Sequence, residues 1–181
     1  MIVLASSSQT RAKILTEADI SFRQISFDYD ESLVAKDLSP NAYVLAVVKS
    51  KKKQFLNAYA DIFDVLFADS CVVCDGKILG KPKDKDDAKR LLDMQSENSA
   101  SVVTAMIFYS KKFELINVSC TTYKFAKFDE TEVDNYIASG LCMDKAGAMM
   151  VEGFNKRYIL SQVGDTSTAR GLNVEILKAF L

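Results

Sequence analysis

The 181-residue sequence predicts one domain of the α/β class, or of the related α+β class, built on a mixed β-sheet. Strand patterns alternate with helix patterns, two pairs of strand patterns are joined as hairpins, and no stretch rich in glycine, proline or serine interrupts them. Apolar residues make up 49% of the chain and charged residues 26%, which is ordinary for a soluble globular protein with a sizeable core. These patterns leave the order of the strands open.

The expected elements follow from hydrophobic periodicity, caps and turns. Strands are expected at residues 2–5, 22–27, 65–74, 77–79, 102–109, 115–125 and 158–163. Helices are expected at residues 10–18, 40–61, 84–93 and 174–180, and between a cap at Asp129 and a stop at Gly140. The chain therefore begins as strand, polar turn and helix.

Local sequence signals fix several of these boundaries. Ser39-Pro40 is typical of an N-cap followed by the first helical position. Asp75-Gly76 is the strongest short signal for a hairpin turn. Asp129 is expected to cap its helix, with Glu132 as the reciprocal carboxylate of a capping box.

Charge and length exclude several classes of function. The chain carries 23 basic and 24 acidic side chains, so it has no overall positive field to hold a nucleic acid or an anionic membrane surface. The apolar start, Met1 to Ala5, is too short for a signal peptide and has no basic segment before it, and no run approaches a membrane span. Four cysteines without an export signal predict reduced thiols in a cytoplasmic protein.

Cys71 and Cys74 form a Cys-x-x-Cys pair inside an apolar strand pattern. A zinc site would need a second pair of ligands, and Cys120 and Cys142 are the remaining soft ligands because the chain has no histidine. A metal or redox role is one interpretation, and the favoured one is that both side chains act as small hydrophobes. Without histidine, any chemistry must rely on carboxylates, lysines, hydroxyls and a bound metal.

The turn from Ser6 to Ser8, between the first strand and the first helix, is a candidate anion site. Hydroxyls and free backbone N–H groups gather there at the positive end of the helix dipole. Arg11, one turn into the helix, would add a charge-assisted hydrogen bond to a phosphate. The alternative is that the serines only cap the helix and form the turn.

Asp69 interrupts an apolar strand, where an unpaired carboxylate is costly to bury. It should therefore meet a cation or lie at the edge of a cleft, and a structural ion pair is the alternative to a functional role. Glu31, with Asp28 and Asp30, forms a second carboxylate group that could converge on the same place and hold a hard divalent ion. The alternative for this group is a solvated acidic loop.

Lysines in two segments are candidates for a site. Lys81 lies between Gly80 and Pro82, which restrain the backbone just beyond the hairpin and aim the ammonium at a fixed point. The lysines of the run 49–53 cannot all face one way on a helix, so at most one or two of them reach a site. The alternative for each is a solvent-facing surface lysine.

Ordered motifs along essentially the whole chain resemble the Maf-like nucleotide pyrophosphatases. An acidic segment is similar to the family's D-x-D-E-S, and a longer one is similar to its A-D-T, apolar strand, D-G and G-K-P. Together with the family's opening, its helix ending in a site lysine and its later signature, the matching segments are residues 4–11, 28–32, 45–49, 68–82, 136–140 and 144–148. Several ordered motifs are far harder to meet by chance than one.

The resemblance implies a mixed, elongated β-sheet flanked by helices, with a cleft between two lobes, related to the inosine triphosphate pyrophosphatases. It also implies that a nucleoside triphosphate is cut between its α- and β-phosphorus atoms, with a divalent cation, Mg or Mn. Glu31 and Asp69 would hold the metal, and Asp69 would also orient and deprotonate the attacking water. A homodimer is a further expectation for the family.

Charge on the phosphates would be neutralised by cations and by the serine turn. The residues in this role would be Ser6, Ser8, Arg11, Lys49 and Lys81. By analogy with the family's pocket, Ser70 and Glu152 would recognise the base.

The sequence also departs from the family pattern. Gln9-Thr10-Arg11 stands where the family usually has Pro-Arg-Arg, and residues 165–173 are a degraded form of its C-terminal motif. Glu152 resembles the subgroup acting on 7-methylated guanine nucleotides, whereas Ser70 and residues 144–148 look more like the subgroup acting on thymidine and uridine nucleotides. A catalytically weak nucleotide-binding protein in cell-division control, or a phosphatase that releases orthophosphate, are the alternative functions.

Overall fold

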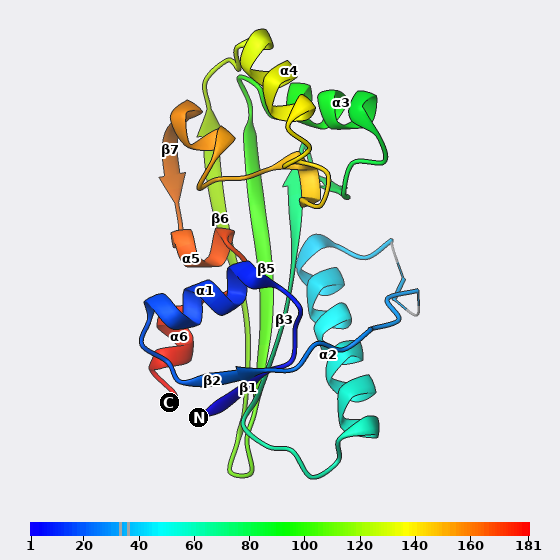
Figure 1. Cartoon of the computed structure of the whole chain (residues 1–181), viewed down its shortest axis with the longest axis vertical. Helices are drawn as coiled ribbons and strands as arrows, with labels where there is room; N and C mark the ends of the chain where they lie inside the picture. The colour runs from blue at the N-terminus through cyan, green and yellow to red at the C-terminus, as the bar shows by residue number, and fades with distance from the viewer. Residues whose placement is uncertain (33, 36) are drawn as a thin grey trace. The chain divides into compact units, whose positions relative to one another are not determined.

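The computed structural model describes residues 1–32, 34–35 and 37–181 (Figure 1). The α-helices are α1 (Gln9–Glu17), α2 (Pro40–Ala58), α3 (Lys85–Gln95), α4 (Glu130–Ala138), α5 (Thr166–Ala169) and α6 (Val174–Lys178), and two 3-10 helices are η1 (Ala146–Ala148) and η2 (Phe154–Tyr158). The strands are β1 (Ile2–Leu4), β2 (Phe22–Gln24), β3 (Val65–Cys74), β4 (Lys77–Leu79), β5 (Ser99–Tyr109), β6 (Glu114–Phe125) and β7 (Ile159–Val163).

The strands form one mixed, seven-stranded sheet in the order β2-β1-β3-β5-β6-β7, with β4 beside β3. Strand β1 pairs in parallel with β2 and β3, whereas β4 and β7 pair antiparallel with β3 and β6. The predicted α/β class, with a mixed sheet flanked by helices, is therefore confirmed. The cleft expected between two lobes stays a prediction.

The chain folds into two compact units that share the three longest strands. The first unit consists of residues 1–70, 103–119 and 165–181, within the described chain, and the second of residues 71–102 and 120–164. Strands β3, β5 and β6 each contribute residues to both units.

The core of the first unit follows from the alternation of side chains along its strands. Leu4 of β1 and Leu66 of β3 point to the face that also buries Leu15 of α1 and Leu177 of α6. Helices α1 and α6 lie on this face and α2 on the other (Figure 1). On the α2 side, the ring of Phe67 packs edge-on against that of Phe55, with 5.5 Å between their centroids.

Strand β2 ends at Gln24, three residues before the expected end of the strand. The backbone of Ile25 still donates to Leu4 across 2.9 Å, and the chain then leaves the sheet. The ring of Phe27 packs against Phe55, with 5.7 Å between their centroids, so this apolar residue belongs to an aromatic cluster and not to the strand. The helices α5, η1 and η2, each five residues or shorter, were not among the expected elements.

The second unit is built around the hairpin of β3 and β4. Asp75 and Gly76 have φ angles of 49° and 71°, the left-handed pair that a two-residue hairpin turn of this type requires. Helix α3 begins one residue after the expected start, because Asp84 is its N-cap and its carboxylate accepts from the backbone N–H of Asp87 across 2.8 Å. An aromatic cluster beneath α4 includes Tyr136 and Phe154, whose rings stack 4.6 Å apart.

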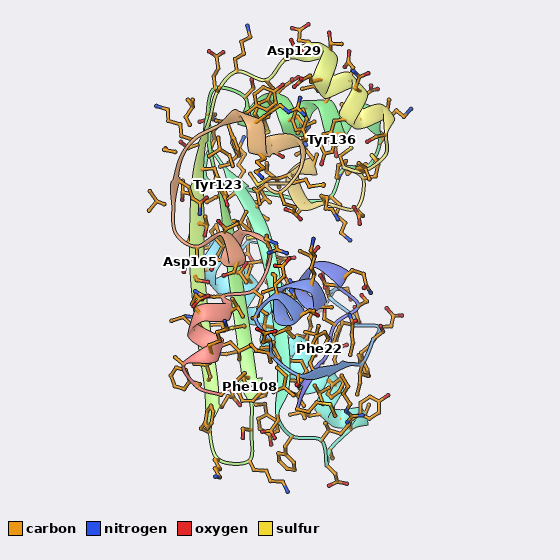
Figure 2. All side chains as sticks on the ribbon, turned by 60° about the vertical axis from the view of Figure 1, so that its left-hand side comes forward. Phe22, Phe108, Tyr123, Asp129, Tyr136 and Asp165 are labelled. Carbon is orange, nitrogen blue, oxygen red and sulfur yellow. The ribbon has the colours of Figure 1, made fainter. Side chains whose placement is uncertain are left out.

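Helix α4 carries Tyr136 and begins after its cap, Asp129 (Figure 2). The Asp129 carboxylate accepts from the Glu132 backbone N–H across 3.0 Å, as predicted. The reciprocal half of the capping box was wrong, because Glu132 accepts from Arg157 and Tyr158 and does not reach back to Asp129. The backbone N–H of Asp129 instead donates to the Tyr158 hydroxyl across 3.2 Å.

The four cysteines are free thiols: Cys71, Cys74 and Cys142 are buried and Cys120 is exposed. Within the described residues no group of three or more histidine, cysteine, aspartate or glutamate side chains could hold a metal ion, so the zinc interpretation finds no support. Burial raises the pKa of the Cys74 thiol, as expected of a small hydrophobe in a strand. None of the described helices is both long enough and apolar enough to cross a membrane.

Candidate active site

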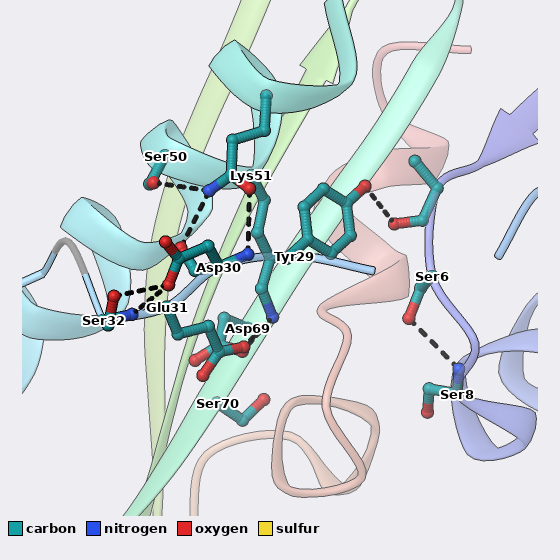
Figure 3. A network of polar contacts seen from close by, with 12 residues as sticks. Ser6, Ser8, Tyr29, Asp30, Glu31, Ser32, Ser50, Lys51, Asp69 and Ser70 are labelled. Atoms are coloured by element: carbon teal, nitrogen blue, oxygen red, sulfur yellow. Dashed lines mark hydrogen bonds and ion pairs between the residues drawn. The ribbon is translucent and has the colours of Figure 1, made fainter. Parts of the chain in front are cut away.

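Two carboxylates and one lysine form the centre of the candidate site. The Lys51 ammonium lies 2.8 Å from Oδ1 of Asp69 and 2.8 Å from Oε1 of Glu31 (Figure 3). Asp69 comes from β3, Lys51 from α2, and Glu31 from the loop between β2 and α2. The Lys51 and Asp69 side chains are only 11% and 16% exposed, so this ion pair is partly shielded from water. The predicted convergence of Glu31 and Asp69 is confirmed in this geometry.

The loop that carries Glu31 is fastened to its neighbours on both sides. Gln54 of α2 makes two hydrogen bonds to the backbone of Asp30, each 2.9 Å long. The Tyr29 hydroxyl donates to the carbonyl oxygen of Ala5 across 3.1 Å. Hydrogen bonds from Ser32 lower the pKa of the Asp30 carboxyl, which keeps that group ionised and turned towards its own loop. Hydrogen bonds therefore fix the position of the acidic loop, and Glu31 in this loop contacts Lys51.

The lysine that meets the carboxylates is Lys51 and not Lys49, which was the residue expected from the family motif. Lys49 is exposed on α2. Lys51 lies on the buried face of the helix, four residues after Val47 and four before Phe55, and both of these are fully buried. The expected role of Lys49 in binding phosphate stays a prediction.

The turn after β1, where the sequence suggested a candidate anion site, leads into the N-terminus of α1. Ser8 caps α1, since its hydroxyl accepts from the Arg11 backbone N–H across 3.3 Å. The Ser6 hydroxyl is buried and accepts from the Ser8 backbone N–H across 3.2 Å. Gln24 of β2 donates to the Ser6 carbonyl oxygen across 2.6 Å and so fixes the turn from outside. The capping and turn-forming roles of the serines are therefore confirmed, and the anion-site role stays a prediction.

Among the described residues, the Arg11 side chain of α1 forms hydrogen bonds only with neutral groups. Its Nε donates to the Gly171 carbonyl oxygen across 2.8 Å, one Nη to Ser6 across 3.4 Å and the other to Ser70 across 3.3 Å. No carboxylate among the described residues forms a salt bridge with it. Burial lowers the pKa of the Arg11 guanidinium, and the nearby charges of Asp69 and Glu31 oppose that effect. A guanidinium has five N–H donors, so these three hydrogen bonds leave two donors for a ligand.

Ser70 lies beside this guanidinium. Its hydroxyl accepts from Arg11 and is 2.8 Å from the Thr104 hydroxyl of β5. In this structure the Ser70 hydroxyl therefore contacts Arg11 and Thr104, whereas the family pattern suggested that it recognises the base. The base-recognition role of Ser70 stays a prediction.

Lys81 and Glu152 belong to the second unit. Both are exposed. The backbone before Lys81 is held as the sequence suggested, because the Gly147 N–H donates to the Gly80 carbonyl oxygen across 2.8 Å. Glu152 forms no ion pair within the described chain. The neighbouring Arg157 forms its ion pair with Glu132.

The donor set at Glu31 and Asp69 fits a magnesium-type cation. Such ions are usually bound by one or two carboxylates together with phosphate oxygens of the substrate and water, and do not need a cage of three protein ligands. Two carboxylate oxygens already converge on one positive charge, that of Lys51. A divalent ion and the ammonium would therefore compete for the same oxygens.

Sequence reasoning missed Lys51 and Thr104. Helical spacing could have identified Lys51, because it falls on the apolar stripe of its helix. Thr104 carries no such signal, since a threonine in an apolar strand pattern is ordinary, and its contacts with Ser70 and Thr168 join distant parts of the sequence.

A family model and several curated proteins match this chain along nearly its whole length. A model of the Maf-like protein family matches residues 1–181. The nucleoside triphosphate pyrophosphatase of Campylobacter jejuni subsp. doylei is 44% identical over 184 aligned positions that cover 100% of both chains, and that of Nitratiruptor sp. is 40% identical over 98% of this chain and 96% of its own. The dTTP/UTP pyrophosphatase of Acholeplasma laidlawii is 34% identical over 98% of this chain and 93% of its own.

Among solved structures, a HAM1 protein from Coxiella burnetii aligns with 85% of this chain and 89% of its own, at 15% identity and a TM-score of 0.43. The family match spans both units, while their folding as a single domain stays a prediction. The full-length match, together with relatives of 40% identity and above, means that this chain belongs to the Maf-like protein family.

Proposed function

We propose that this protein is a nucleoside triphosphate pyrophosphatase that releases a nucleoside monophosphate and pyrophosphate. Its enzyme class is that of its relatives, a hydrolase of nucleoside triphosphates. The observation that carries the proposal is the Arg11 guanidinium, which has neutral partners and two unused donors beside a serine turn at a helix N-terminus. An anion with two oxygens, such as a phosphate group, fits this arrangement.

The two carboxylates suit the other half of the reaction. Glu31 and Asp69 would hold a divalent cation, Mg or Mn, which would neutralise charge on the triphosphate and lower the pKa of a bound water. Asp69, the more buried of the two, would orient the attacking water and accept its proton. Lys51 donates to Asp69 and would release that carboxylate oxygen to the cation.

The leaving pyrophosphate needs positive charge, which Arg11, Lys81 and the serine turn would supply, with Lys49 as a further candidate. The base would be recognised by Glu152, because the Ser70 hydroxyl, the other residue expected in this role, is engaged by Arg11 and Thr104. We expect the substrate to be either a methylated or otherwise non-standard purine nucleotide or a thymine or uracil nucleotide. The name of the Acholeplasma relative favours the second class for that protein, whereas the carboxylate of Glu152 favours the first for this one.

The decisive experiment is a screen of standard, methylated and otherwise modified nucleoside triphosphates with added Mg²⁺ or Mn²⁺, in which the products are identified. Accumulation of pyrophosphate and the monophosphate supports the proposal. Release of orthophosphate alone would assign a phosphatase instead. Binding without any product would assign a nucleotide-binding protein without turnover.

A further inference from the structure

Five residues of the first unit close a ring of hydrogen bonds around the Arg11 guanidinium. Arg11 donates to Ser70 at one end and, across 2.8 Å, to the Gly171 carbonyl oxygen at the other. Ser70 continues to Thr104 across 2.8 Å, and Thr104 donates to the Thr168 carbonyl oxygen across 2.8 Å. The Gly171 N–H donates to that same oxygen across 2.9 Å, which completes the ring. We call these five residues the Arg11 ring.

The direction of every proton in the Arg11 ring is determined. A carbonyl oxygen only accepts, so Thr104 must spend its single hydroxyl proton on Thr168. Ser70 must therefore donate to Thr104, and its own oxygen is left to accept from Arg11. Ser70 can then donate nothing to a substrate while the ring is closed. Its hydroxyl serves the guanidinium.

Burial makes this arrangement rigid. Thr104 and Thr168 are each 1% exposed, so water cannot substitute for their partners. Gly171 has a φ angle of 107°, and a side chain built there would lie 3.4 Å from both Arg11 and Ser70. The backbone of the C-terminal segment therefore lies so close to the guanidinium that a single added carbon atom at Gly171 would already be in van der Waals contact with it.

We propose that Thr104 is a positioning residue that acts through Ser70 to hold the guanidinium plane of Arg11, so that its two unused donors face the phosphate. The proposal rests on the proposed function, because it assigns Arg11 the triphosphate. Thr104 itself touches no substrate. It sets the orientation of Ser70, and Ser70 with the Gly171 carbonyl oxygen sets the orientation of Arg11.

The test is a cycle of Thr104→Val, Ser70→Ala and the double variant, assayed for pyrophosphate release with Mg²⁺ and the best nucleotide of the screen. Thr104→Val keeps the shape of the side chain and removes its hydroxyl. We expect each single variant to lose about tenfold in kcat/KM, the size of one hydrogen bond to a charged group. In the Ser70→Ala background, Thr104→Val should lower kcat/KM by less than about twofold, because the hydrogen bonds from Thr104 through Ser70 to Arg11 are already lost.

Two further variants separate positioning from folding. Thr104→Ser keeps the hydroxyl that Thr104→Val removes, so it should retain most of the wild-type activity. Thr122→Val is the matched control, since Thr122 of β6 and Ser101 of β5 form a similar pair of hydroxyls, 2.7 Å apart, on two neighbouring strands. It should retain wild-type kcat/KM. Thermal unfolding of every variant shows whether the fold is intact.

A readout independent of turnover is the NMR signal of the Arg11 side chain in protein with isotope-labelled arginine. The Nη–H signals should be resolved in the wild type, where the ring restrains the guanidinium, and averaged in Thr104→Val and Ser70→Ala. Thr122→Val should leave them resolved. If the wild type releases no pyrophosphate from any nucleotide, the proposed function fails while this spectrum still tests the ring. Equal losses from Thr104→Val in both backgrounds, or unchanged Arg11 signals, would overturn the inference.

Discussion

Lys51 places its ammonium 2.8 Å from the Asp69 carboxylate and equally close to that of Glu31, so one cation joins a strand, a helix and a loop. Two carboxylates that point at one position repel each other unless a positive charge lies between them. In the protein without metal, Lys51 supplies that charge. Lys51 therefore differs from the other lysines of residues 49–53 in the pair of carboxylates that it contacts.

Lys51→Met should destabilise the first unit, whereas Lys49→Met should not. Losing the ammonium leaves Asp69, 16% exposed, without its cation, and we expect a loss of about 1–3 kcal/mol in the free energy of unfolding, the range for a hydrogen bond to a charged group. Lys49 is exposed, and its substitution should change stability by less than about 0.5 kcal/mol. Urea denaturation of both variants in metal-free buffer measures the difference. Equal stabilities would show that the Lys51 pairs are energetically neutral.

Asp69→Asn should abolish pyrophosphate release while leaving the fold intact. The amide keeps the shape of the carboxylate and its oxygen still accepts from Lys51, but it can neither take a proton nor balance a divalent charge. We expect kcat to fall by at least about 100-fold, as for loss of a general base. Product assays with matched circular dichroism spectra test this. A folded Asp69→Asn protein with wild-type rates would remove Asp69 from the mechanism.

Lys81→Ala should weaken the stabilisation of developing phosphate charge. The backbone of the preceding Gly80 is fixed by Gly147, so the ammonium extends from a restrained position. The expected loss in transition-state stabilisation is about 2–4 kcal/mol, the range for one such contact. Lys83→Ala, two residues further along in an exposed position, is the control and should be near wild type. A loss in kcat/KM of less than about tenfold for Lys81→Ala would make it a surface lysine.

Glu17 predicts a pH dependence of stability for the first unit. The hydrogen bond from Arg170 lowers the pKa of the Glu17 carboxyl in the folded protein, below its ordinary value of 4.5. A depressed folded-state pKa contributes stability above the ordinary pKa and loses it as the pH falls through the folded-state pKa. Wild type should therefore exceed Glu17→Gln in stability at neutral pH, and the gap should shrink below pH 4.5.

Urea denaturation of wild type and Glu17→Gln at neutral pH and at about pH 3 measures this gap. Glu175→Gln removes an exposed carboxylate that forms no ion pair in the described parts of the chain and serves as the control. A gap between wild type and Glu17→Gln that is the same at both pH values would contradict the linkage.

Much of the fold was predictable because its signals are local. The long strand β3 was expected at the residues where it occurs, and the Asp75-Gly76 turn requires the positive φ angles that these two residues adopt. The cap at Asp129 also follows from a short sequence pattern. The capping box failed at Glu132 because a distant cation, Arg157, offers its carboxylate a stronger partner than a backbone N–H.

The site was predictable in its residue types and less so in its partners. An aspartate inside an apolar strand needs a cation, and this rule identified Asp69 without identifying Lys51. The lysine run has no period of its own, so the choice within it depends on which face of α2 is buried. Ser70 shows the same limit, because its hydroxyl partners come from Arg11 and from Thr104, which are distant in sequence.

Glu152 remains the residue with the strongest expected influence on which base is accepted. Its carboxylate is exposed, and within the described chain it forms no ion pair, since the neighbouring Arg157 is bound to Glu132. A carboxylate only accepts hydrogen bonds, so it favours a base edge that presents N–H donors. Guanine presents N1–H beside an exocyclic amine, and a positive charge, as on a 7-methylated guanine, would strengthen the pairing.

Thymine and uracil offer a single N3–H between two carbonyl oxygens, which a carboxylate leaves unpaired or repels. Glu152→Gln introduces an amide that both donates and accepts, so it should shift preference towards these pyrimidines. We expect the ratio of kcat/KM for paired guanine and thymine or uracil triphosphates to fall by about tenfold or more, since specificity is measured by that ratio. Glu130→Gln, an exposed carboxylate at the start of α4, is the matched control. If the ratio is the same in wild type and Glu152→Gln, the carboxylate does not meet the base and another residue sets the choice.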